Sequence, residues 1–180
     1  MRRIIESTLV SLDGVIGDPH TWAGAYFDDA ARQRSLEQLR DGDAMLMGRR
    51  TYEIFSALWP GAEGPYADRI NEMPKYVFSS TLERAEWRNT RIVRGDVAAQ
   101  VAALKRADGR DLIVYGHGRF GHTLLEHGLL DELHLYVHPL VVGRGTLLFQ
   151  GGAQHRLEHL ATRTFDTGVV GLTYRPRAEP

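Results

Sequence analysis

Short apolar runs, separated by glycine and proline, divide the chain into segments of alternating type. Apolar runs typical of β-strands lie at residues 4–10, 44–47, 75–78, 90–94 and 111–115. Between them, apolar side chains recur at the helical spacing of three or four residues in segments 27–40, 51–58, 97–104 and 120–125. Strands that alternate with helices are typical of a parallel sheet covered by helices on both faces.

The C-terminal part of the chain follows a different pattern. Residues 157–174 contain two strand-like segments joined at Asp166-Thr167-Gly168, a turn sequence typical of a β-hairpin. Upstream, residues 133–138 alternate between apolar and polar side chains, which predicts a strand with one exposed face. The sequence therefore predicts a three-layer α/β/α fold with a mixed, mainly parallel central sheet and an antiparallel C-terminal hairpin.

The composition is that of a globular protein. The chain has 180 residues, of which 43% are hydrophobic and 25% charged, a size and composition typical of one domain. Its 22 Lys and Arg against 23 Asp and Glu give a net charge of −1, which argues against a broadly basic nucleic-acid-binding surface. There is no cysteine, no apolar run long enough for a membrane span, and no signal-peptide pattern at the N-terminus. We expect a single cytoplasmic domain over residues 1–180, without membrane or nucleic-acid partners.

In parallel α/β sheets, ligands bind at the carboxyl ends of the strands. At the first suggestive strand end, residues 47–53, the chain turns through Gly48 into a helix. Arg49, Arg50 and Thr51 would lie at the helix N-terminus, whose N–H groups and dipole attract anions. Two guanidinium groups there suit a phosphate monoester such as the 2′-phosphate of NADP; simple solvation of both arginines is the alternative.

Two further strand ends carry hydroxyl groups or glycines. Ser79, Ser80 and Thr81 follow an apolar strand and can bond ribose or phosphate oxygens, although they can equally cap a turn. Residues 116–121 match the pattern G-x-G-x-x-G between a strand and a helix. A full Rossmann unit also requires an acid after the next strand, and that acid is missing, so we exclude a Rossmann unit. The glycines can still let the backbone at the helix start approach a pyrophosphate. A glycine-rich turn without a ligand is the alternative.

Histidine spacing argues against a metal site, although seven of the eight histidines follow residue 116. On a strand, His134 and His138 would have Cα atoms about 13 Å apart, too far to share one ion. On a helix, His117, His122 and His127 would diverge, because a spacing of five rotates successive members by about 140°. We therefore expect no metal, while His138 could face a pocket.

Three acids lie nearest the expected cleft. Asp13 ends the first strand, and Asp28 and Asp29 open the first helix. A partly desolvated carboxylate can donate or relay a proton, so Asp13 and Asp28 are the catalytic candidates. Helix capping is the alternative for Asp28 and Asp29. Trp22, in the loop before this helix, is expected to close the substrate pocket.

Several short motifs, considered together, indicate a family. They are residues 11–17 (SLDGVIG), 47–53 (MGRRTYE), 75–82 (KYVFSSTL), 114–120 (VYGHGRF), 124–133 (LLEHGLLDEL), Pro139 and residues 143–149 (GRGTLLF). In order and spacing they resemble the dihydrofolate-reductase-like superfamily, in particular the branch related to the reductase domain of the riboflavin-biosynthesis deaminase–reductase. The resemblance covers nearly the whole chain and implies a dihydrofolate-reductase-like fold.

The resemblance also implies an NADPH site at the positions already singled out. The start of the second helix and the hydroxyl run would hold the adenosine 2′-phosphate, the glycine-rich turn would meet the pyrophosphate, and the 15–17 loop would lie beside the nicotinamide. The expected cofactor-binding residues are Val15, Ile16, Gly48, Arg49, Arg50, Thr51, Ser79, Ser80, Thr81, Gly116, His117, Gly118, Arg119 and Phe120.

By this resemblance the protein would be an NADPH-dependent reductase. Its substrate would be a small heterocyclic or sugar-phosphate compound, as for 5-amino-6-(5-phosphoribosylamino)uracil reductase or dihydrofolate reductase. Residues 20–24 replace the Leu-Pro-Trp segment usual in the folate enzymes. Tyr115 stands where the riboflavin branch often has an acid, and His117 separates the two glycines that follow, so the resemblance assigns neither substrate. A catalytically inactive nucleotide- or flavin-binding protein of the same fold is the alternative. Relatives in this branch are often homodimers, and we expect a homodimer here.

Overall fold

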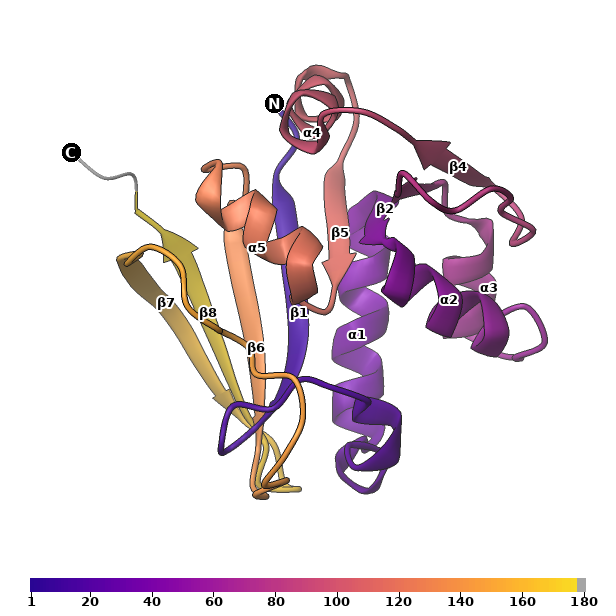
Figure 1. The fold of residues 1–180 in the computed structure, drawn as a ribbon. Helices are drawn as coiled ribbons and strands as arrows, with labels where there is room; N and C mark the ends of the chain where they lie inside the picture. The colour runs from indigo at the N-terminus through magenta and orange to yellow at the C-terminus, as the bar shows by residue number, and fades with distance from the viewer. Residues whose placement is uncertain (178–180) are drawn as a thin grey trace.

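In residues 1–177, the part of the chain that the structure describes, eight strands form one sheet in the order β4-β3-β2-β5-β1-β6-β8-β7 (Figure 1). This computed structural model has the strands β1 (Ile4–Ser11), β2 (Gly42–Gly48), β3 (Lys75–Phe78), β4 (Thr90–Val93), β5 (Asp111–Tyr115), β6 (Glu132–His138), β7 (Leu157–Thr164) and β8 (Val170–Pro176). Strands β1 to β6 pair in parallel, while β8 pairs antiparallel with both β6 and β7. The predicted mixed, mainly parallel sheet with an antiparallel C-terminal hairpin is confirmed.

Helices cover the two faces of the sheet and create two hydrophobic cores. The helices are α1 (Asp29–Asp41), α2 (Arg49–Leu58), α3 (Pro65–Glu72), α4 (Val97–Arg106) and α5 (Gly118–Glu126), with short 3₁₀ turns η1 (Pro19–Thr21) and η2 (Gly24–Tyr26) before α1. Because successive strand residues point to opposite faces, Met45 joins the core with α1 and α3, whereas Leu46 joins the core with α4 and α5. This confirms the three-layer arrangement. No helix within residues 1–177 is long and apolar enough to span a membrane.

The sequence analysis missed α3. The segment before it contains Pro60, Gly61 and Gly64, and the helix itself begins with Pro65, so no helical pattern was identified there. Proline is well tolerated in the first turn of a helix, where its missing N–H would have no intrahelical partner. Ala67 and Ile70 then bury one side of this short helix against the sheet.

The prediction of one exposed face for β6 is wrong. His134 and His138 are only 6% and 2% exposed, so the polar side of this strand is buried as well. The reason is that β6 lies inside the sheet, between β1 and β8, and is covered near its end by Trp22 and Tyr26. Alternation of apolar and polar residues indicated an open face, but the polar residues are two buried histidines and the partly buried Tyr136.

The parallel strands β1 to β6 end at the same side of the sheet, which we call the carboxyl edge. It is formed by the residues that end these strands, namely Ser11, Gly48, Phe78, Val93, Tyr115 and His138. The connections that follow these residues carry the segments that the sequence analysis singled out. The fold therefore brings those segments to one edge.

Candidate active site

Three of the segments expected to bind a cofactor meet at the carboxyl edge. Strands β3, β2 and β5 are neighbours, so the residues that follow them come side by side. Arg49 Nη1 donates to Thr81 Oγ1 over 2.8 Å, which joins the start of α2 to the hydroxyl run. The rings of Phe78 and Phe120 stack with centroids 4.8 Å apart, which joins the end of β3 to α5. Together these segments form one continuous surface.

Glycines keep side chains away from this surface. Gly116 and Gly118 have φ values of +74° and +46°, in the left-handed region that favours glycine. Among the described atoms, none lies within 4 Å of the position where a Cβ of Gly118 would stand, and the nearest to that of Gly116 is Thr51 Oγ1 at 4.0 Å. Open space beside backbone N–H groups at a helix start suits a phosphate chain.

Helices α2 and α5 begin here without side-chain caps. Within residues 1–177, neither Gly48 nor His117 makes a capping hydrogen bond to the helix that follows, and neither first turn contains an acid. By contrast, Asp28 and Asp96 accept backbone N–H bonds of 2.8 and 2.9 Å at the starts of α1 and α4. The N–H groups and positive dipole ends of α2 and α5 are therefore available to an anion.

Both arginines of α2 have partners that a ligand could replace. Arg49 Nε lies 2.6 Å from Glu53 Oε1, and Arg50 Nη2 lies 3.4 Å from Asp18 Oδ1. The Arg49 and Arg50 side chains are 48% and 68% exposed. Exposed ion pairs contribute little free energy, so either guanidinium group can turn to a phosphate at small cost.

Arg94, which the sequence analysis did not single out, supports the hydroxyl run. It follows β4 and donates 2.7 Å bonds to the carbonyls of Ser80 and Leu82. Ser79 Oγ accepts from the backbone N–H groups of Thr81 and Leu82, so this hydroxyl caps the turn, as one alternative proposed. The position of Arg94, directly after a strand at the carboxyl edge, is the pattern that could have revealed it.

The His117 side chain points into the protein. Its Nδ1 lies 2.7 Å from Glu6 Oε1, and the side chains are only 2% and 0% exposed. A Cβ on Gly121 would stand 2.8 Å from His117 Nδ1 and 3.0 Å from Glu6 Cδ, so the first turn of α5 presses directly on this pair. His117 can therefore offer a ligand its backbone N–H, whereas Arg119 is exposed in the same turn.

The loop expected beside the nicotinamide is held by a segment more than 120 residues away. Val15 forms an antiparallel bridge with Leu147, and the Ile16 N–H donates to the Thr146 carbonyl over 2.8 Å. Val15 is buried and Ile16 half-buried. The motifs at residues 11–17 and 143–149 are thus two halves of one structure.

Asp13 fastens this structure and is not placed as a proton donor. Its carboxylate accepts hydrogen bonds from the Ser11 hydroxyl (2.6 Å) and from the N–H groups of Val142 (3.1 Å) and Gly143 (2.7 Å). These bonds, that of Ser11 foremost, lower the pKa of Asp13 to about 2. The group is therefore ionised at neutral pH, and its oxygens accept bonds that hold the loop.

Aromatic rings enclose the end of β6. The ring of Trp22 meets His138 edge to face at 5.2 Å between centroids, and Tyr26 does so at 5.6 Å. Trp22 Nε1 donates to the Gly17 carbonyl over 2.9 Å, which ties this enclosure to the 15–17 loop. Burial lowers the pKa of His138, so its imidazole is neutral at pH 7. Trp22 thus lies where a substrate pocket beside that loop would need a wall.

On the α1 face of the same edge lie buried polar groups. Ser7 Oγ donates to Gln38 Oε1 over 2.7 Å. In the described part of the chain, Gln38 Nε2 is buried and has no hydrogen-bond partner, and the Tyr115 hydroxyl is buried beside that of Tyr66. Burial raises the pKa of Tyr115 well above its usual range, so the hydroxyl keeps its proton. Such groups can satisfy the polar atoms of a heterocycle.

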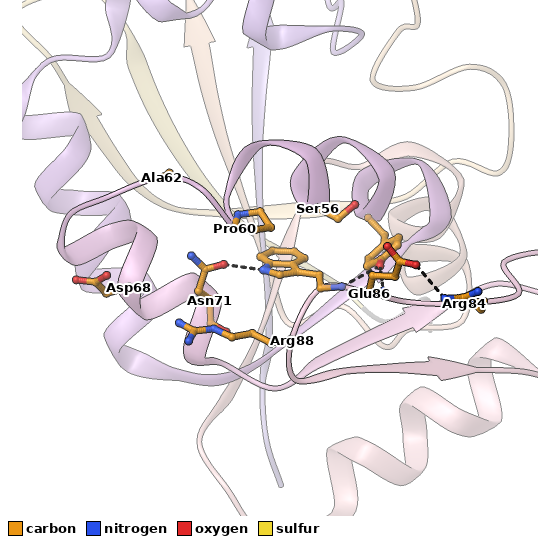
Figure 2. A pocket seen from close by; sticks show the side chains of 10 residues that line it. Ser56, Pro60, Ala62, Asp68, Asn71, Arg84, Glu86 and Arg88 are labelled. Carbon is orange, nitrogen blue, oxygen red and sulfur yellow. Dashed lines mark hydrogen bonds and ion pairs between the residues drawn. The ribbon is translucent and has the colours of Figure 1, made fainter.

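A cavity of about 810 Å³ lies away from this edge, between α2, α3 and residues 84–88 (Figure 2). Trp87 lies in its wall and donates from Nε1 to Asn71 Oδ1 over 2.6 Å. The buried Lys75 ammonium lies 4.4 Å from the centroid of the Trp87 ring and donates to three backbone carbonyls. The expected cofactor residues do not line this cavity.

No three His, Asp or Glu side chains within residues 1–177 come together in a way that could hold a metal ion.

The chain was compared with known proteins. Residues 2–171 match the family described as the RibD C-terminal domain. The chain belongs to this family. Membership confirms the resemblance to the riboflavin-biosynthesis branch of the dihydrofolate-reductase-like superfamily.

Individual relatives extend this assignment. YyaP, an uncharacterised protein of Bacillus subtilis strain 168, is 31% identical over 182 residues, covering 96% of this chain and 94% of YyaP. A Shewanella sp. PV-4 structure named for riboflavin biosynthesis has a TM-score of 0.77 at 21% identity and covers 98% of this chain and 99% of its own. The Thermotoga maritima deaminase/5-amino-6-(5-phosphoribosylamino)uracil reductase has a TM-score of 0.69 at 16% identity, covering 98% of this chain and 57% of its own. Both structures support the fold.

Proposed function

We propose that the protein is an NADPH-dependent reductase that transfers hydride to a small heterocyclic or sugar-phosphate substrate. The observation that carries this proposal is the continuous surface at the carboxyl edge, where two uncapped helix starts, two arginines and a hydroxyl run converge. Membership in the RibD C-terminal domain family supports it, as does the name of the Thermotoga structure, which includes 5-amino-6-(5-phosphoribosylamino)uracil reductase.

In this proposal the chain holds the cofactor along that surface. Arg49 and Arg50, at the start of α2, bind the adenosine 2′-phosphate together with the exposed hydroxyls of Ser80 and Thr81. The N–H groups at the start of α5 bind the pyrophosphate. Val15 and Ile16 lie against the nicotinamide, which supplies the hydride when bound.

The substrate would lie between the 15–17 loop and the α1 face. Trp22 excludes water from the reacting atoms, and the buried amide of Gln38 and hydroxyl of Tyr115 orient the polar atoms of the heterocycle. Because Tyr115 keeps its proton at neutral pH, its hydroxyl can donate a hydrogen bond to the substrate. Asp28 stays a candidate proton source, whereas the ionised Asp13 does not suit that role.

The test is a titration of the purified protein with NADPH and NADH, followed by quenching of its three tryptophans. We expect preferential binding of NADPH. In Arg49→Ala and Arg50→Ala, NADPH affinity should fall about tenfold or more while NADH affinity changes little, since hydrogen bonds to charged groups contribute about 1.5–3 kcal/mol. Arg32→Ala is the matched control, because Arg32 also lies in a first helical turn beside an acid, 3.3 Å from Asp29. Equal losses for both cofactors would refute the 2′-phosphate assignment.

The second candidate is a catalytically inactive nucleotide- or flavin-binding protein of the same fold. It is favoured by the positions of Asp13 and Asp28, both of which serve loop or helix structure. It predicts cofactor binding without oxidation of NADPH across a panel of pyrimidines, pteridines and sugar phosphates. Turnover of any one of them decides for the reductase.

A further inference from the structure

A groove of about 340 Å³ lies on the α1 face, between α1 and strands β6, β8 and β7. Cross-strand partners share a face of the sheet, so Tyr136, Gly171 and Arg163 form one row across the three strands. Gly171 has no side chain, and a Cβ there would stand 3.6 Å from Tyr136 Cε1. The middle residue of this row therefore places no side chain between Tyr136 and Arg163, and the Phe165 ring lies 3.5 Å from its Cβ position.

Two arginines from different elements line this groove. Arg34 comes from α1 and Arg163 from β7, and the charges of both act on the Tyr136 hydroxyl. Burial raises the pKa of Tyr136, and the positive charges of Arg34 and Arg163 oppose that rise. Among the described residues that line the groove, the charged ones at neutral pH are these two arginines, and no acid is among them.

Protein carboxylates leave these charges largely uncompensated. Arg34 Nη1 is 3.9 Å from Glu37 Oε2, beyond hydrogen-bond distance, and Gln33 already donates to that carboxylate. In the part of the chain that the structure describes, Arg163 forms no ion pair. Most other ion-paired arginines hold an acid at 3.4 Å or less, as Arg3 holds Asp111 at 2.5 Å.

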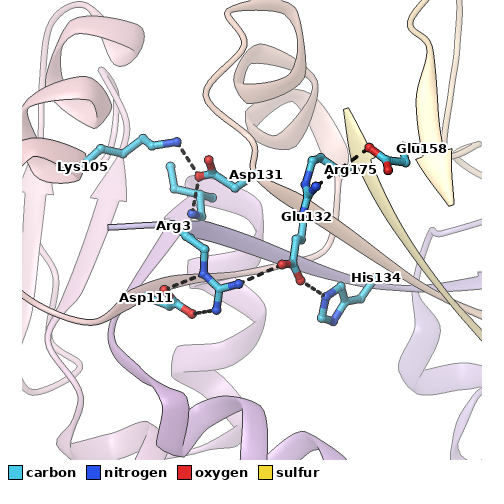
Figure 3. Close-up of polar contacts among 9 residues, drawn as sticks. Arg3, Lys105, Asp111, Asp131, Glu132, His134, Glu158 and Arg175 are labelled. Carbon is cyan, nitrogen blue, oxygen red and sulfur yellow. Dashed lines mark hydrogen bonds and ion pairs between the residues drawn. The ribbon is translucent and has the colours of Figure 1, made fainter. Parts of the chain in front are cut away.

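Glu132, the acid that contacts His134 in the groove lining, also has a partner outside the groove. His134 lines the groove and lies 3.0 Å from Glu132 Oε2. The other oxygen of Glu132 accepts from Arg3 over 2.9 Å, so this carboxylate belongs to the ionic network at the opposite edge of the sheet (Figure 3). Burial lowers the pKa of His134, so its imidazole is neutral at pH 7.

From this arrangement we propose that the groove between Arg34 and Arg163 binds the phosphate group of a small molecule, at a site separate from the carboxyl edge. The planar forks of two guanidinium groups match phosphate oxygens, and the hydroxyls of Tyr136 and Thr173 complete the lining. The volume lies at the lower end of the range of about 300–1,000 Å³ for small-ligand sites. The Tyr136 ring offers an apolar wall to whatever carries the phosphate.

Isothermal titration with inorganic phosphate and with phenyl phosphate tests the site. The carboxyl edge is a second place where phosphate could bind, so the parent for this experiment is the Arg49→Ala/Arg50→Ala protein. We expect phosphate to bind this parent, and phenyl phosphate to bind more tightly because its ring can contact Tyr136. Arg34→Gln and Arg163→Gln should each weaken binding about tenfold or more.

Arg156→Gln is the matched control, since Arg156 is exposed, precedes β7 and does not line the groove. It removes the same charge and should change phosphate affinity less than twofold; circular dichroism verifies the fold of each variant. The proposal is overturned if phosphate does not bind the parent at millimolar concentration, or if Arg156→Gln weakens binding as much as Arg163→Gln. The proposal is also overturned if the wild-type protein binds phosphate and the Arg49→Ala/Arg50→Ala parent does not, because the carboxyl edge would then be the site.

Discussion

Helices α1 and α4 and helices α2 and α5 all follow parallel strands, yet they begin in two different ways. Asp28 and Asp96 satisfy the first N–H groups of α1 and α4 from within the chain. Within the described residues, α2 and α5 have no such cap and are held by packing of their first turns instead. At the starts of α1 and α4 the protein itself satisfies free backbone N–H groups, whereas at the starts of α2 and α5 a ligand can do so.

The packing that replaces the cap differs between α2 and α5. A Cβ on Gly48 would stand 3.3 Å from Phe120 Cβ, so the start of α2 is held against α5. The start of α5 is held against β1, where Gly121 lies on the buried Glu6–His117 pair. Removing a capping side chain from α1 or α4 and adding a Cβ to the tightly packed first turn of α5 should therefore have different effects on stability.

The largest effect is expected for Gly121→Ala. The new Cβ would overlap Glu6 and stand 2.8 Å from His117 Nδ1, and these two side chains are buried and in contact with each other. Overpacking of this kind costs about 1–3 kcal/mol of unfolding free energy. Urea unfolding followed by circular dichroism measures the loss, and NADPH titration should show weaker binding, because the start of α5 must shift.

Gly24→Ala provides the control for this change. In the described structure nothing lies within 4 Å of its Cβ position, and its backbone is outside the left-handed region. It should leave the urea midpoint almost unchanged. A wild-type midpoint for Gly121→Ala would mean that α5 does not rest on the Glu6–His117 pair.

The Glu6–His117 contact could not be predicted from the sequence. Glu6 stands in an otherwise apolar strand, and His117 in a glycine-rich turn 111 residues later. Only the pairing of β1 with β5, and the packing of α5 over β1, bring the two together. Local patterns established the strands, most of the helices and the order of the edge segments, because each depends on residues close in sequence.

The role of Asp13 could not be predicted for the same reason. Residue type and position made Asp13 and Asp28 candidates for proton transfer, and capping was an open alternative for Asp28. The partners of Asp13 are N–H groups 129 and 130 residues away, which no local pattern reveals. In contrast, Asp28 caps a helix through a bond to an N–H three residues on, which is a local property.

A smaller effect is expected when the caps themselves are removed. Asp28→Ala and Asp96→Ala should each cost about 1 kcal/mol, while Asp28→Asn and Asp96→Asn should retain most of the stability, because an amide oxygen can also cap. Urea unfolding measures these differences, and NADPH affinity should stay at the wild-type value in all four variants. The variants Asp28→Ala and Asp28→Asn also test whether Asp28 takes part in catalysis. If Asp28→Asn keeps its stability but loses turnover, the carboxylate supplies a proton in addition to capping α1.

The smallest effect is expected for Asp13→Asn, and its dependence on pH makes it measurable. The pKa of Asp13 is lowered from 3.8 to about 2 in the folded protein, so the ionised carboxylate favours folding above pH 3.8, and this contribution disappears as the pH falls through about 2. The melting temperature of Asp13→Asn should therefore lie below that of the wild type from pH 5 to 7, and the two should converge between pH 4 and pH 2. A rate that keeps its wild-type pH profile in Asp13→Asn would agree with a loop-fastening role. Loss of a pH limb together with an unchanged melting temperature would instead make Asp13 the proton source and give the carboxyl edge an acid that acts on substrate.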